Sequence, residues 1–212
     1  MKINAVITKK PHIKAQSDRF DMFDRTLLAI FGAMFISVIA GAIVYKIKSS
    51  SFSPAVFDTF VAFSTDITGK SFFEAFSGFF AADLSILVII TIFGVSAFGR
   101  VPILATAVFR VFGVGALGAY LFDKFGFSGL KYFLIVIIPG RLFMFFALLL
   151  SVQNCFQTCC KTRRILNGNS TESINFKFYL LRNAVAAIIF VVAALTDTLL
   201  LRFVSGHFLP VL

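Results

Sequence analysis

The fold is decided by residues 101–122, which read VPILATAVFRVFGVGALGAYLF. The run is 22 residues long, and Arg110 is the only charged residue in it. A bilayer core about 30 Å thick needs about 20 apolar residues of helix, because lipid offers the backbone amides no hydrogen-bond partner outside the helix itself. The run therefore predicts a helix that crosses a membrane.

The composition of the whole chain agrees with this interpretation. Of its 212 residues, 58% are hydrophobic and 14% are charged, and the mean hydropathy is +0.92. These values exclude a disordered chain, a soluble coiled coil and a nucleic-acid-binding domain, despite the net charge of +10. We predict an all-α fold, a polytopic membrane helix bundle with about five transmembrane helices plus short amphipathic external helices.

Five stretches are long and apolar enough to span the bilayer, so residues 27–203 are expected to form a single transmembrane domain. Gly99-Arg100-Val101-Pro102 is too short for anything except a tight turn, and it predicts an antiparallel hairpin of the second and third spans. The expected spans are about 27–45, 80–99, 101–122, 132–152 and 179–201.

The positions of Lys and Arg predict the orientation, since basic loops tend to stay in the cytoplasm. With the N-terminus inside, the inner segments carry 11 of the 20 Lys and Arg residues and the outer segments carry 6. We therefore expect a multi-pass protein of the cell membrane, with a basic cytoplasmic tail at residues 1–26 and an external tail at residues 204–212. The basic clusters are expected to bind the lipid bilayer and no nucleic acid.

Residues 52–79 are external by this count, yet they are rich in Phe. The aromatic residues recur at a spacing of three or four, which predicts short amphipathic helices. These helices either lie in the outer headgroup layer and cap the bundle, or they offer a docking face to an external partner. The candidate interface residues are Phe57, Phe60, Phe63, Phe72, Phe73 and Phe76.

Two cations and two acids inside the predicted spans form a candidate charge network of Arg110, Arg141, Asp83 and Asp197. Both Arg residues fall near the middle of their spans, where an unpaired Arg costs several kcal/mol, so they are expected to face protein, water or a carboxylate. One interpretation is an ion-pair network that fixes the helix register. The other is an anion or substrate path, or a coupling site for another membrane protein.

Residues 113–118 match G-x-G-x-x-G, which is typical of a dinucleotide site when it follows a strand and opens a helix. Here the pattern lies inside a continuous apolar run. We therefore interpret its small residues as positions where a neighbouring helix approaches closely. The candidate packing residues are Gly113, Gly115, Gly118 and Ala119.

Other residues of catalytic type lack the partners that catalysis needs. Ser96 has no base, because both histidines, His12 and His207, lie in the predicted tails. The two His and two Glu of the chain are not clustered as the ligands of a hydrolytic metal site are. We predict no enzymatic activity, no catalytic residue, no metal and no cofactor.

Three cysteines, Cys155, Cys159 and Cys160, stand together on the predicted cytoplasmic side, where thiols stay reduced. We expect them to be small, apolar juxtamembrane residues. Lipidation is the alternative.

A pattern of aromatic, glycine and proline residues runs through residues 72–152. It comprises an aromatic helix followed by Phe93-Gly94, Ser96, Gly99, Pro102, Phe109-Arg110, Gly113, Gly118, Gly126, Gly129 and Ile138-Pro139. This pattern resembles the core of the stage II sporulation protein M family, which are polytopic bacterial membrane proteins.

The resemblance implies a non-enzymatic membrane scaffold that serves sporulation and engulfment by recruiting and localising peptidoglycan-degrading partners. The expected partners are external cell-wall hydrolases or other membrane proteins. A homo-oligomer is a further alternative. The alternative function is a small permease or transporter subunit, with Arg110 and Arg141 lining the path.

Overall fold

The computed structural model describes residues 12–48, 71–168 and 175–203, and almost all of these residues are helical. This confirms the predicted all-α class for the described part of the chain. The elements are α1 (His12–Lys48), α3 (Phe72–Val95), α4 (Arg100–Tyr132), the π-helix η1 (Phe133–Ile137), α5 (Ile138–Leu166) and α6 (Phe176–Phe203).

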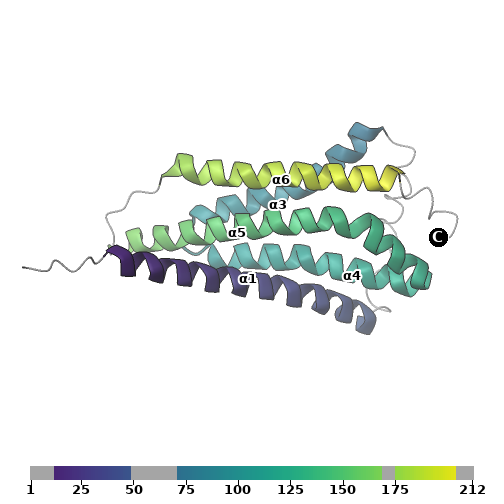
Figure 1. Cartoon of the computed structure of the whole chain (residues 1–212), viewed down its shortest axis with the longest axis horizontal. Coiled ribbons are helices and arrows are strands. Elements are labelled where there is room, and N and C mark those ends of the chain that lie inside the picture. The colour runs from purple at the N-terminus through teal and green to yellow at the C-terminus, as the bar shows by residue number, and fades with distance from the viewer. Residues whose placement is uncertain (1–11, 49–70, 169–174, 204–212) are drawn as a thin grey trace, which may run out of the picture.

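The helices lie side by side along one long axis (Figure 1). The helices α1, α4 and α6 run in one direction, and α3 and α5 run in the other. The connection between α3 and α4 is only Ser96–Gly99, where the amide of Gly99 donates to the carbonyl of Ser96 at 3.2 Å. The predicted hairpin is therefore present, and its turn is as tight as the sequence requires.

Four helical stretches of the described residues are long and apolar enough to cross a membrane: Thr26–Ile47, Phe72–Val95, Arg100–Leu166 and Phe176–Phe203. This count does not confirm the fifth predicted span. Arg100–Leu166 is a single stretch of 67 residues that contains two predicted spans, 101–122 and 132–152. At about 1.5 Å per residue it would be about 100 Å long, several times the thickness of the bilayer core.

The backbone of this long stretch is broken at Gly126, inside the connection that the sequence predicts between the two spans. Its φ of 59° and ψ of −135° are not helical. A residue with a Cβ is strained in this region, so glycine suits the position. The chain reverses beyond it, and η1 and α5 return alongside α4 (Figure 1).

Several helix boundaries differ from the predicted ones. Helix α3 begins at Phe72, so residues 72–79 belong to the same helix as the predicted span from residue 80, and no separate external helix is formed by them. The reason is local: Ser71 caps the helix by accepting a hydrogen bond from the Glu74 amide at 3.3 Å, and no proline follows before Val95. Helix α1 likewise begins at His12, inside the predicted tail, and α5 continues past residue 152 to Leu166.

Helix α1 packs closely against α4 because small residues face each other across the interface. A Cβ added at Gly115 would lie 3.0 Å from the Cα of Val38, and one added at Gly41 would lie 3.1 Å from the backbone nitrogen of Ala116. Ser37 also donates a hydrogen bond to the carbonyl of Val108 at 2.7 Å. Such close approach is how small residues stabilise helix pairs in lipid, where no hydrophobic force drives helices together.

The predicted packing residues fall into different environments. Gly115 faces α1, and a Cβ at Gly118 would lie 2.9 Å from the ring of Phe133. Ala119 is half-buried beside a hollow between α1 and α4. The prediction is wrong for Gly113, which is exposed and has open space where a Cβ would stand, because it lies on the face of α4 turned away from the bundle.

The contrast between two glycines on one helix gives a stability test. We expect Gly115→Leu to lower the free energy of unfolding by about 2 kcal/mol, because the new side chain must push α1 away from α4. The matched control Gly113→Leu places the same side chain in open space and should not destabilise the protein. Thermal unfolding of the purified protein in detergent compares the two, and equal losses would contradict the packing described here.

Candidate functional site

The four charged residues of the candidate network come together as two ion pairs, and each member comes from a different helix. Asp83 lies on α3, Arg110 on α4, Arg141 on α5 and Asp197 on α6. The Arg110 Nη2 lies 2.5 Å from Asp83 Oδ1, and the Arg141 Nη2 lies 3.5 Å from Asp197 Oδ2. The structure thus shows which acid partners which base, a question that the sequence left open.

In the first pair the carboxylate is deeply buried and the guanidinium is not. Asp83 has 1% of its side chain exposed, while Arg110 has 27% exposed. The Nε of Arg110 is buried and has no hydrogen-bond partner among the described residues. A buried carboxylate of this kind needs a cation beside it, because burial of an unpaired charge is very costly.

The second pair is more enclosed, with 9% of the Arg141 side chain and 4% of the Asp197 side chain exposed. The Arg141 guanidinium also lies 5.9 Å from the centre of the Phe79 ring, a cation–π contact, and 3.7 Å from the sulfur of Met144. Gly140 makes room for the acid, because a Cβ at this position would overlap the carboxylate of Asp197. The second ion pair therefore requires glycine at position 140, next to Arg141 in the sequence.

Helix α3 connects the two pairs. Asp83 and Phe79 are four residues apart, so they lie on one face of the helix, and they contact Arg110 and Arg141 respectively. Ion pairs between α3 and α4 and between α5 and α6, joined through Phe79, fix the relative register of four helices. Among the described residues, no group of three or more His, Cys, Asp and Glu could hold a metal ion.

The two cations lie at different depths, which the sequence did not predict. The Arg100 guanidinium donates to the Cys160 sulfur at 2.6 Å, so the start of α4 lies beside the end of α5. Counted from this level at about 1.5 Å per residue, Arg110 lies about 15 Å along the bundle and Arg141 about 28 Å. Because α5 extends well beyond its predicted end at residue 152, Arg141 is further from that end of the bundle than a mid-span position would be.

A second polar cluster, whose members were not among the predicted site residues, joins α5 to α6 and α3. Asn154 donates to the Oδ1 of Asn183 at 2.9 Å, and Tyr179 donates to the carbonyl of Thr91 at 2.7 Å. The Cys155 sulfur lies 3.2 Å from the Tyr179 hydroxyl. The side chains of this cluster are buried, so their hydrogen bonds compensate for the loss of water and link the helices.

The sequence contains a signal for this cluster. Asn154 and Asn183 are amide side chains inside or beside apolar runs, and such residues in membrane helices commonly bond across a helix interface. The pairing also depends on Gly94, because a Cβ there would lie 2.8 Å from the Cβ of Cys155 and would overlap the Tyr179 hydroxyl.

The cysteines are more polar in their contacts than expected. Cys155 belongs to the cluster above, Cys159 donates to the carbonyl of Ala97 at 3.5 Å, and Cys160 accepts from Arg100. All three are free thiols. They contribute to helix contacts at this end of the bundle, rather than serving only as small apolar residues.

The candidate aromatic interface is described only in part, since Phe57, Phe60 and Phe63 lie outside the described residues. Phe72 and Phe73 are exposed in the first turn of α3, and Phe73 has 75% of its surface exposed. Phe76 is half-buried and stacks on Phe80 with ring centres 5.8 Å apart. In Figure 1 this end of α3 lies at the side of the bundle, next to α6.

Comparison with known proteins gives one match. A family model described as Stage II sporulation protein M matches residues 27–200, which is most of the chain and includes all four members of the two ion pairs. No curated protein and no solved structure matches the chain significantly.

Proposed function

The chain belongs to the stage II sporulation protein M family, and on this premise we propose that it is a non-enzymatic scaffold in the cell membrane. Family membership and the apolar helices support a membrane protein of sporulation. In this proposal the protein recruits and localises peptidoglycan-degrading partners. The observation that carries it is the exposed aromatic start of α3, where Phe72 and Phe73 are turned away from the core.

The proposal includes a topology with five crossings, a cytoplasmic N-terminus and an external C-terminus. The break at Gly126 and the antiparallel course of α4 and α5 support two crossings within Arg100–Leu166. The charges support the orientation, because the end of the bundle assigned to the cytoplasm has cations and no acid among its described side chains. These cations are Arg100, Lys161, Arg163, Arg164, Lys177 and Arg182.

With this topology the aromatic start of α3 faces the space outside the cytoplasmic membrane, where wall hydrolases act. Phe73 is a large apolar side chain that the other described residues leave uncovered, and aromatic residues are typical anchors in protein interfaces. The ion pairs below it hold α3 to α4, α5 and α6, which gives the aromatic anchor a rigid base.

Crosslinking in intact cells tests this function. We expect a photo-crosslinking residue at position 73 to capture a cell-wall hydrolase, and Phe73→Ala to reduce co-purification of that hydrolase at least about tenfold, as loss of an interface anchor typically does. The matched control is position 109, where Phe is equally exposed but lies on α4 within the span. Recovery of lipid alone at position 73 would contradict the scaffold.

One observation favours the alternative, a small permease or transporter subunit. Arg110 lies well within its span and keeps 27% of its side chain exposed, as a residue lining a path would. In a permease, Arg110→Gln together with Asp83→Asn would abolish uptake of a solute and leave the crosslinks of position 73 unchanged. In a scaffold, the same double variant would change no uptake.

A further inference from the structure

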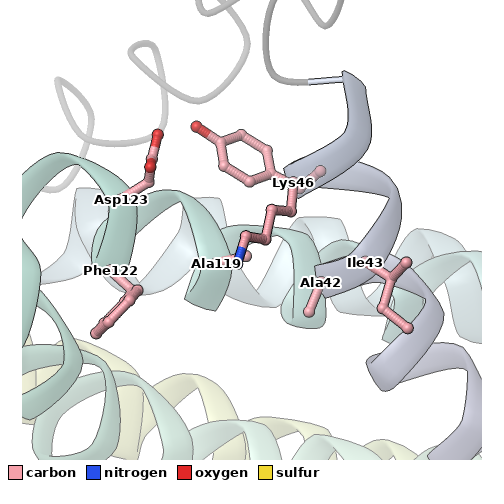
Figure 2. A pocket seen from close by; sticks show the side chains of 7 residues that line it. Ala42, Ile43, Lys46, Ala119, Phe122 and Asp123 are labelled. Atoms are coloured by element: carbon pink, nitrogen blue, oxygen red, sulfur yellow. The ribbon is translucent and has the colours of Figure 1, made fainter.

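A hollow of about 370 Å³ lies between α1 and α4, near the C-terminal end of α1 (Figure 2). Its apolar part comes from small and aromatic side chains of both helices, and its polar part from Lys46, Asp123 and Tyr45. Along α4 the hollow lies well beyond the first ion pair, because Asp123 is 13 residues after Arg110. The lining residues are Ala42, Ile43, Tyr45, Lys46, Ala119, Phe122 and Asp123.

The two charges at this hollow do not pair with each other. Lys46 and Asp123 are both exposed, and neither forms an ion pair or hydrogen bond with another residue of the described chain. Figure 2 shows the Lys46 side chain reaching from α1 over Ala119, while the Asp123 carboxylate points away from it. Their neighbour Lys124, in contrast, is bonded to the Tyr120 hydroxyl at 2.9 Å.

The hollow lies at the depth of lipid headgroups. The first apolar stretch is Thr26–Ile47, and its 22 residues are about 33 Å long at 1.5 Å per residue, the thickness of the hydrocarbon core. Lys46 stands at the end of this stretch, and Asp123 lies three residues before the break at Gly126. Along both helices the apolar lining residues come before the charged one, and α1 and α4 run in the same direction, so the backbone positions of both charged residues lie nearer the headgroups.

We propose that this hollow binds one phospholipid whose zwitterionic headgroup carries a primary ammonium, as phosphatidylethanolamine does. The Lys46 ammonium would bind the phosphate, the Asp123 carboxylate would accept hydrogen bonds from the lipid ammonium, and Ala42, Ala119 and Phe122 would contact the glycerol and the upper acyl chains. A volume of this size is within the range of small-ligand pockets.

The two charges determine the headgroup. A carboxylate accepts hydrogen bonds from a primary ammonium, whereas the trimethylammonium of phosphatidylcholine has no N–H to donate. A headgroup with a phosphate but no cation, as in phosphatidylglycerol, would satisfy Lys46 but would offer Asp123 only neutral hydroxyls, which bind a carboxylate more weakly than an ammonium does. The site should therefore prefer phosphatidylethanolamine to both of these lipids.

Native mass spectrometry of the purified full-length protein, titrated with each of the three lipids with matched acyl chains, tests the proposal. We expect one phosphatidylethanolamine to be retained, with affinity at least about tenfold above that for phosphatidylcholine or phosphatidylglycerol, which is the effect of losing one charge-assisted hydrogen bond. Asp123→Asn and Lys46→Gln should each reduce this affinity about tenfold. Lys131→Gln, which removes an exposed cation from the same end of α4, is the control and should have no effect.

A third variant tests the hollow itself. Ala119→Phe places a ring in the space between the helices and should abolish the retained lipid, while the melting temperature shows whether the bundle remains folded. Equal retention of all three lipids, or unchanged retention in Ala119→Phe, would overturn the proposal. The proposal would also be overturned if Asp123→Asn retained phosphatidylethanolamine as well as the unmodified protein does. A crosslink showing that residues 49–70 of the same chain occupy the hollow would overturn it too.

Discussion

Replacing Asp83 with Leu is expected to lower the free energy of unfolding by about 3 to 5 kcal/mol and to reduce accumulation of the protein in the membrane. The substitution removes the carboxylate 2.5 Å from Arg110 and leaves a guanidinium, with its buried Nε already unpaired among the described residues, inside an apolar bundle. Unfolding of the purified protein in detergent measures the first effect, and quantitation in membranes measures the second.

A double-mutant cycle distinguishes loss of the pair from loss of packing. Asp83→Leu/Arg110→Leu should recover most of the stability, because replacing both members of a buried pair with apolar residues is often close to neutral. The control is Asp123→Leu, which changes an exposed acid with no ion-pair partner among the described residues and should shift the free energy of unfolding by less than about 0.5 kcal/mol. Strictly additive single effects would contradict the pairing of Asp83 with Arg110.

The same double variant decides between the two interpretations of the charges. If the pair only fixes helix register, the stable apolar double variant should still be captured with a hydrolase from position 73. If it folds and accumulates normally but loses the complex, the charges contribute to function directly. If the two single variants accumulate poorly while the double variant accumulates and is captured normally, the pair serves only to fix helix register. The defect of each single variant then reflects the cost of an unpaired charge in the membrane.

Much of the fold could be predicted from the sequence, because a membrane helix is specified by a local property. Apolar runs of about 20 residues, such as Leu27–Tyr45, identify helices without knowledge of any tertiary contact. The ends of these helices were harder to predict. The first turns of α3 show the reason: Phe72, Phe73, Phe76 and Phe79 have the same three- and four-residue spacing whether they form a separate amphipathic helix or the start of a span.

The residues of the candidate site could be predicted from the sequence, but the ion pairs that they form could not. Asp83, Arg110, Arg141 and Asp197 were found because charges are costly in lipid and therefore rare there. Which acid meets which base depends on the rotation and depth of four helices, and the length of α5 moves Arg141 away from the depth of Arg110. The rotation of α4 likewise decides that Gly115 contacts α1 while Gly113, two residues earlier, faces away from the bundle.

The second large effect is expected from a single methyl group. We expect Gly140→Ala to lower the free energy of unfolding by about 2 to 3 kcal/mol, because its Cβ would overlap the Asp197 carboxylate, which must move away from Arg141 inside a tightly packed site. The control is Gly113→Ala, which adds the same methyl group in open space and should be neutral or slightly stabilising, since alanine favours a helix more than glycine does. Combining Gly140→Ala with Arg141→Leu and Asp197→Ala removes the carboxylate that the methyl group displaces, so this triple variant should be more stable than Gly140→Ala alone. If Gly140→Ala unfolds at the same temperature as Gly113→Ala, the Asp197 carboxylate does not lie against Gly140, and the second ion pair must be arranged differently.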